Sequence, residues 1–154
     1  MRIDRVFTVE GQSAYETIAF RTVSSEIRNP DGSVVFKQDN IEIPEKWSQV
    51  ASDVLAQKYF RKAGVAAALK PVSEANVPEF LWRKEPEEGA PTNAGEHSAR
   101  QVFDRLAGTW AYWGWKGGYF DGEKDASAFF DEMRYMLAAQ MAAPNSPQWF
   151  NTGL

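Results

Sequence analysis

The chain has 154 residues with 17 lysines and arginines against 21 aspartates and glutamates, so its formal net charge is −4. Its hydrophobic content of 44% excludes a disordered chain, and its length fits one domain or one piece of a larger domain. The chain contains no cysteine and one histidine, which excludes disulfides, thiolate metal sites and thiol catalysis by its own residues. A mildly acidic chain also lacks the clustered basic face that direct DNA binding requires.

The first part of the chain comprises residues 1–64, and the pattern near its beginning is typical of a β-hairpin. Apolar side chains alternate with polar ones along residues 18–24 and 34–36, and the sequence NPDG between them favours a tight turn. A second short β run is predicted at residues 41–43, and we expect it to stop at Pro44 because proline ends strand pairing.

The end of this first part has the spacing of a helix. From Pro44 to Tyr59, apolar side chains recur at helical intervals, and a proline suits the first helical turn. Arg61 and Lys62 suit the last turn, and Gly64 is typical of the position just after a helix. The spacing therefore predicts one helix that begins at Pro44 and ends before Gly64.

The middle part, residues 65–97, has a different composition. It contains several prolines, which interrupt regular structure, and several negatively charged glutamates. This composition is typical of an extended connector. The apolar residues 80–82 are expected to attach its middle to a surface. Residues 85–95 are expected to be its most mobile stretch.

The last part, residues 98–154, is predicted to contain two helices followed by an extended segment. The first apolar stripe, before a glycine pair, comprises Val102, Phe103, Leu106, Trp110 and Trp113. The second stripe comprises Ala126, Phe129, Phe130, Met133, Leu137, Gln140 and Met141. Because Pro144 and Pro147 lie close together, we expect the remaining residues to be extended or irregular. Together these elements predict a mostly helical α+β fold.

Several candidate sites have a structural explanation that we favour. His97 has no nucleophile or carboxylate beside it in the sequence, which favours a solvated helix flank. Residues 121–132 imitate a calcium loop, but Ala126 stands where the loop needs glycine, so an acidic helix start is favoured. The aromatic run within residues 110–120 suits core packing or an interface better than a stacking platform for bases. Gly117-Gly118 is typical of a helix end rather than a phosphate cradle.

The closing sequence is harder to explain as a simple loop. Polar residues with hydroxyl and amide groups, including Asn145, Ser146 and Asn151, alternate there with two aromatic residues. A rigid segment of this composition can present a hydroxyl and backbone N–H groups to a polar ligand such as a phosphate or a ribose.

The same closing sequence, APNSPQWFNTGL, resembles the segment that leads into the catalytic barrel of ribonucleotide reductases. FRTVSSEIRNPDGSVVF, EKWSQVASDVLAQKYFRKAGV and RQVFDRLAGTWAYWGWKGGYFD resemble the N-terminal region of the adenosylcobalamin-dependent, class II enzymes. The resemblance implies a longer enzyme that converts ribonucleotides, expected to be diphosphates, to 2′-deoxyribonucleotides for DNA synthesis. In that family, adenosylcobalamin generates a thiyl radical on a cysteine of the barrel.

This chain departs from the family's active pattern because it has no cysteine, so we expect it to be inactive alone and to carry no cobalamin. Its helices are expected to cover one end of a barrel in the same or a partner chain. Ser146 matches a hydroxyl that helps to hold the substrate in related reductases, and Asn145 and Asn151 are weaker candidates. No catalytic or metal-binding residue is assigned.

The expected partners are thus a ribonucleotide and the barrel, with neither DNA nor a membrane bound directly. Exposed aromatic residues also favour self-association into a homo-oligomer. The longest aliphatic run, residues 65–69, is too short to span a membrane, and we expect a cytoplasmic protein. An alternative stays open, in which the chain is a stand-alone module that binds a separate reductase subunit.

Overall fold

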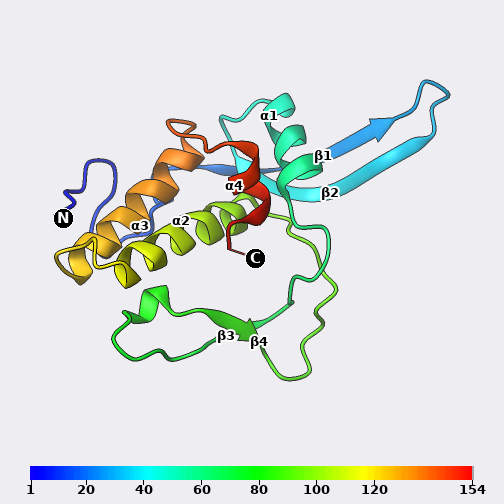
Figure 1. Ribbon diagram of the computed structural model, residues 1–154. Coiled ribbons are helices and arrows are strands. Elements are labelled where there is room, and N and C mark those ends of the chain that lie inside the picture. The colour runs from blue at the N-terminus through cyan, green and yellow to red at the C-terminus, as the bar shows by residue number, and fades with distance from the viewer. Residues whose placement is uncertain (154) are drawn as a thin grey trace.

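A computed structural model describes residues 1–153 as a β-hairpin followed by helices. The hairpin pairs β1 (Phe20–Arg28) with β2 (Val34–Pro44) in antiparallel fashion. The long helix α2 (Ala99–Lys116) packs against α3 (Glu123–Ala138). In Figure 1 the tip of the hairpin reaches away from these two helices. The arrangement agrees with the predicted α+β class.

Smaller elements connect and flank these four. Figure 1 shows β3 and β4 on the side of the molecule opposite α1. The small elements are α1 (Gln49–Val54), the π-helical turn η1 (Leu55–Tyr59), β3 (Leu69–Pro71), the 3₁₀ turn η2 (Glu79–Leu81), β4 (Lys84–Pro86) and α4 (Ser146–Asn151). Within residues 1–153, no helix is long and apolar enough to cross a membrane.

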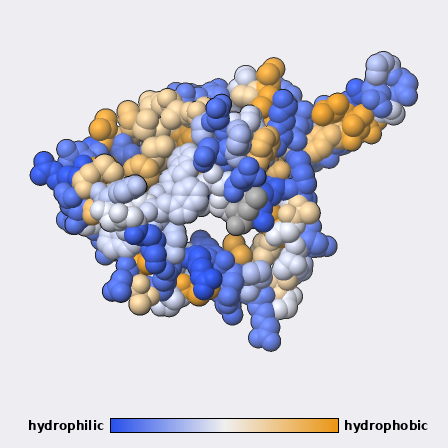
Figure 2. Space-filling view, in the orientation of Figure 1, coloured by the Kyte–Doolittle hydropathy of each residue, from blue (hydrophilic) through white to orange (hydrophobic). Residues whose placement is uncertain are grey.

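The predicted hairpin is confirmed, and its turn has the expected chemistry. Gly32 takes a φ of +86°, and the Asp31 carboxylate accepts a hydrogen bond of 2.8 Å from the backbone N–H of Ser33. The two β runs expected at residues 34–36 and 41–43 are one continuous strand, β2. Figure 2 shows apolar surface along the projecting hairpin, and its exposed aliphatic residues include Ile27, Val34 and Val35.

The predicted start of the first helix is wrong. Pro44 is the last residue of β2, and the helix begins five residues later at Gln49, where the Ser48 side chain caps it. The helical stretch also ends earlier than predicted, at Tyr59, so the two basic residues expected in its last turn follow it. Proline suits a strand end as well as a helix start, and pairing with β1 decides between them.

The connector is mostly irregular, as predicted, but two short stretches within it pair as the strands β3 and β4. Its middle is attached to the helices through residues 80–82, which confirms that expectation. Leu81 is buried, and the Phe80 ring stacks on Phe130 of α3 with centroids 6.2 Å apart. The proposed division into residues 1–64, 65–97 and 98–154 stays a prediction.

The core forms where α2 lies between the hairpin and α3. The α2 residues Val102, Phe103 and Leu106 are fully buried there, which confirms most of the first stripe. Trp113, expected in the same stripe, is 55% exposed. The second stripe is also shorter than predicted, because α3 ends at Ala138.

The closing residues differ from the prediction. The sequence predicts an extended segment after Pro144, whereas the structure forms the short helix α4 there. Pro147 lies in its first turn, where a missing N–H breaks no helical hydrogen bond. We call residues 144–153 the closing segment.

Candidate functional site

Ser146, the residue assigned to substrate binding from the resemblance, is exposed at the start of α4. Its Oγ atom lies 2.9 Å from the phenolic oxygen of Tyr59, the last residue of η1. The Tyr59 ring stacks on Trp149, with centroids 5.4 Å apart and an interplanar angle of 22°. It also contacts the Phe150 ring, with centroids 5.2 Å apart. The closing segment therefore docks on Tyr59 through two aromatic rings and one hydroxyl pair.

A buried arginine joins the closing segment to α2. The Arg105 side chain is 9% exposed and its partner Glu96 is 3% exposed, with 2.7 Å between Nε and Oε1. The same guanidinium donates to the carbonyl oxygens of Trp149 and Thr152, each at 3.0 Å. It also donates to the Tyr59 carbonyl at 3.0 Å. One side chain thus holds the end of η1 and both ends of the last helical turn.

Side-chain hydrogen bonds rigidify the closing segment further. The indole of buried Trp149 donates to the Pro144 carbonyl at 2.9 Å. The Gln148 side-chain oxygen accepts from the Thr152 hydroxyl at 2.7 Å and from the indole of Trp110 at 3.3 Å. A six-residue helix is marginal alone, so these contacts and Arg105 determine its position.

The anchored segment presents polar groups to solvent. Ser146, Asn145 and Asn151 are all exposed, and the Asn145 side chain makes no capping hydrogen bond to α4. A hydroxyl has one donor hydrogen and two acceptor lone pairs, so the contact with Tyr59 leaves Ser146 able to bind a ligand oxygen. The arrangement suits hydrogen bonding to a phosphate or a sugar, and it contains no general acid–base pair.

The structure places His97 away from any catalytic arrangement. Its backbone N–H donates to the Gln101 side chain at 2.8 Å, and its carbonyl accepts from the backbone of Glu42 at 2.9 Å. These bonds belong to the start of α2, whose Ser98 and Gln101 form a capping box. His97 therefore lies at an exposed helix flank, as predicted.

Acidic residues of 121–132 accept hydrogen bonds from the N-terminal segment. The Asp125 carboxylate accepts from the backbone N–H of Ile3 at 2.8 Å. The Glu132 carboxylate accepts from three consecutive backbone N–H groups, residues 6–8, at 2.9–3.1 Å. Among the residues that the structure describes, no group of three potential metal-ligating side chains occurs.

The aromatic run divides between the interior and the surface. The Trp115 indole donates to the Asn76 carbonyl at 2.7 Å and thereby fastens the connector. Trp113 and Tyr119 are 55% and 63% exposed. Gly118, at the end of α2, has a φ of +70°, in agreement with its predicted role in ending the helix.

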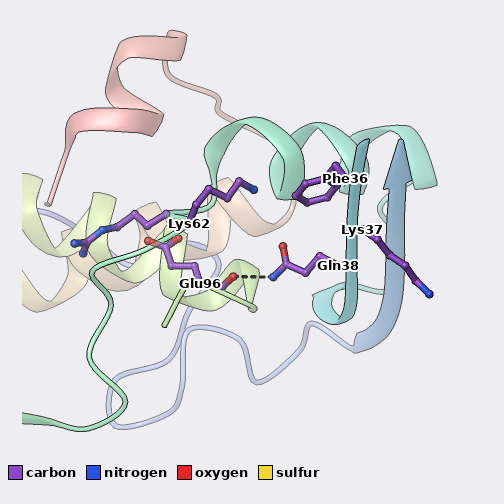
Figure 3. A pocket seen from close by; sticks show the side chains of 7 residues that line it. Phe36, Lys37, Gln38, Lys62 and Glu96 are labelled. Carbon is purple, nitrogen blue, oxygen red and sulfur yellow. Dashed lines mark hydrogen bonds between the residues drawn. The ribbon is translucent and has the colours of Figure 1, made fainter. Parts of the chain in front are cut away.

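A small hollow of about 220 Å³ lies beside Glu96 (Figure 3). The Gln38 side chain donates to the Glu96 carbonyl at 2.9 Å, and the Lys62 ammonium lies 4.7 Å from the Phe36 ring centroid. Burial lowers the pKa of Lys62. Figure 3 shows Lys37 pointing away, so its charge does not converge on the hollow.

Three residues that build the site were missed by sequence reasoning, namely Tyr59, Glu96 and Arg105. Tyr59 was assigned only to an apolar helix face, and Glu96 only to the charged connector. One signal does exist for Arg105, because two charged residues, Asp104 and Arg105, stand between the buried Phe103 and Leu106. A long cation within a core stripe predicts a buried partner.

Comparisons with known proteins agree on one family. The model of the family described as "Class II vitamin B12-dependent ribonucleotide reductase" matches residues 21–140. Relatives with the name "Vitamin B12-dependent ribonucleotide reductase" include proteins of Bradyrhizobium diazoefficiens, 67% identical, and Agrobacterium fabrum, 63% identical, in each case over the whole chain. One of Streptomyces coelicolor is 32% identical over 99% of the chain. The chain spans only 13% of the length of each of these three relatives.

Proposed function

The chain belongs to the family of class II vitamin B12-dependent ribonucleotide reductases, and from this premise we propose that it serves as the N-terminal part of such an enzyme. The proposed reaction is the reduction of ribonucleoside diphosphates to 2′-deoxyribonucleotides for DNA synthesis. The identity of 67% over the whole chain to a relative with that name supports the proposal. So does the anchored hydroxyl of Ser146, which is the observation that carries the role of this part.

The proposed contribution of the chain is binding rather than redox chemistry. It holds no cysteine, so the thiols that take up and supply electrons belong to the rest of the enzyme. The Ser146 hydroxyl would donate a hydrogen bond to a phosphate or sugar oxygen of the ribonucleotide. Because Arg105 and Tyr59 hold the segment before substrate arrives, little ordering entropy is lost on binding.

Adenosylcobalamin is the cofactor implied by the family, and a site for it in this chain would need a cavity of sufficient volume. One hollow holds about 220 Å³, and another, beside Trp115, about 350 Å³. Pockets for drug-sized ligands hold roughly 300–1,000 Å³, and a corrin with its nucleotide is larger than such ligands. These hollows do not fit the cofactor, so we assign no residue of this chain to it. We propose that adenosylcobalamin binds elsewhere in the full-length enzyme.

Replacing Ser146 in the full-length enzyme tests the proposal. Ser146→Ala removes one ligand hydrogen bond, worth about 0.5–3 kcal/mol depending on the charge of its partner, so kcat/KM should fall roughly 2- to 160-fold. Ser146→Thr, which keeps the hydroxyl, should restore most of the loss. Ser73→Ala is the matched control, since Ser73 is exposed in the connector. Unchanged kinetics for every ribonucleotide in Ser146→Ala would remove this residue from the site.

The second candidate function is that of a stand-alone module that binds a separate reductase subunit. The exposure of Trp113 and Tyr119 favours it, because large aromatic residues at a surface are typical of interfaces. The same surface suits contact with the barrel of the same chain or self-association. Sequencing the reading frame past the Leu154 codon separates the two functions. A continuation into a cysteine-bearing region supports the N-terminal part, and a stop codon supports the module.

A further inference from the structure

The hydroxyl pair of Tyr59 and Ser146 suggests more than a packing contact. We propose that Tyr59 is a positioning residue that aims the Ser146 hydroxyl at the substrate. The inference rests on the proposed role of Ser146 in substrate binding. The two residues are 87 positions apart in the chain, and their oxygens lie 2.9 Å apart.

The direction of the hydrogen bond gives Tyr59 its effect. A free serine hydroxyl rotates about its Cβ–Oγ bond, so its hydrogen has no fixed direction. A phenol is a stronger acid than an aliphatic hydroxyl and is therefore the better donor of the two groups. When the Tyr59 hydroxyl donates to Oγ, one lone pair of Ser146 is occupied and its own hydrogen is left for a ligand. Tyr59 thus keeps Ser146 in the role of donor.

The position of Tyr59 is fixed by contacts that do not involve its hydroxyl. Its ring packs against Trp149 and Phe150, and its carbonyl accepts a hydrogen bond from Arg105 at 3.0 Å. Replacement by phenylalanine keeps both ring contacts and the carbonyl bond, so the change removes only the donor. The hydroxyl can therefore be tested apart from the packing.

The local backbone also accounts for where Tyr59 points. η1 is a π-helical turn, in which the N–H of Phe60 bonds to the carbonyl of Leu55 at 3.0 Å, five residues earlier. Such wide turns insert an extra residue into a helix and occur frequently at functional sites. Here the turn lets Phe60 be buried in the core while Tyr59, half-buried, faces the closing segment.

A double-mutant cycle in the full-length enzyme tests the proposal, with kcat/KM measured for Tyr59→Phe, Ser146→Ala and the double variant. We expect Tyr59→Phe alone to lower kcat/KM about three- to tenfold, the effect of one neutral hydrogen bond. In the Ser146→Ala background, the same change should have no further effect, because no hydroxyl is left to orient. Tyr112→Phe is the control, since its hydroxyl donates to Glu74 at 2.9 Å and not to the closing segment.

The outcomes separate the positioning role from the proposed function. If the Tyr59 hydroxyl were purely structural, Tyr59→Phe would lower kcat/KM by the same factor in the wild type and in Ser146→Ala. That result would overturn the positioning role while leaving Ser146 in the site. A Tyr59→Phe enzyme with unchanged kcat/KM would overturn it as well. If Ser146→Ala itself has no effect, the proposed substrate-binding role of Ser146 fails, and the positioning role of Tyr59 fails with it, while the family assignment stands.

Discussion

Replacing Arg105 by methionine is expected to destabilise the chain by about 3–5 kcal/mol, the typical cost of removing one partner of a buried ion pair. Methionine keeps most of the aliphatic volume and removes the charge. Among the described residues, the Glu96 carboxylate accepts side-chain hydrogen bonds only from Arg105, and at 3% exposure it would be left without a hydrogen-bonded side-chain partner. The three backbone carbonyls held by Arg105 can turn to water if the closing segment detaches, so we add no separate cost for them.

The assay is urea unfolding of the 154-residue chain, with hydrogen exchange of the closing segment measured in parallel. Lys116→Met is the matched control, because it breaks an ion pair with Glu74 in which the lysine is 51% exposed. Such exposed pairs contribute about 0–1 kcal/mol. If Arg105→Met lost no more free energy of unfolding than Lys116→Met, the anchoring role of the buried pair would be refuted. Unchanged exchange protection in residues 146–152 would refute it too.

Two further predictions concern the close backbone contact at Gly153 and the hydrogen-bonded carboxylate of Glu132. Gly153 has a φ of +77°, and a Cβ there would lie 2.7 Å from the Arg105 carbonyl, so Gly153→Ala should raise exchange rates in the closing segment and cost about 1–3 kcal/mol in urea unfolding. Glu132 is expected to make stability fall at acid pH. Burial raises its pKa, but the hydrogen bonds from Thr8 and the neighbouring backbone outweigh this and hold the pKa below the usual 4.5. Its stabilisation is therefore complete above pH 4.5, is lost as pH falls through the lowered pKa, and should be missing at neutral pH in Glu132→Gln.

Controls for these two changes come from the same chain. Gly32 also has a positive φ, but a Cβ there meets nothing within 4 Å, so Gly32→Ala should cost less than Gly153→Ala. For the pH effect, the difference in unfolding free energy between the wild type and Glu132→Gln should shrink between pH 5 and pH 3. A difference that is constant over this interval would show that the Glu132 charge is not what holds the N-terminal segment.

The parts of the fold that could be predicted from sequence are those with a strong local pattern. The hairpin has alternation and a turn sequence, and α2 and α3 have apolar stripes long enough to be unambiguous. Two of the errors occur at prolines. Pro44 and Pro147 each suit two local structures, and the choice depends on contacts with β1 and with α2. Sequence periodicity does not contain those contacts.

The candidate site was predictable only in its exposed part. Ser146 is a candidate because its segment resembles a known motif and combines a hydroxyl with neighbouring prolines, and its substrate-binding role stays a prediction. Tyr59 and Glu96 come from other regions of the chain, and their roles exist only once Arg105 joins them. Tyr59 lies 46 positions before Arg105 and Glu96 lies nine positions before it, and neither pairing shows in the apolar spacing of the segments involved.

The position of Ser146 therefore depends on two buried charged side chains, Arg105 and Glu96, to which we assign no ligand contact. The helix that carries it has six residues and is too short to be stable alone, so the guanidinium of Arg105 fixes it relative to α2. That guanidinium can remain buried only because Glu96 neutralises it. Glu96 belongs to the connector, whose backbone is bonded in turn to the Arg61 carbonyl just after η1. Replacing Glu96 is consequently expected to change the positions of both Tyr59 and Ser146, because one arginine holds both segments.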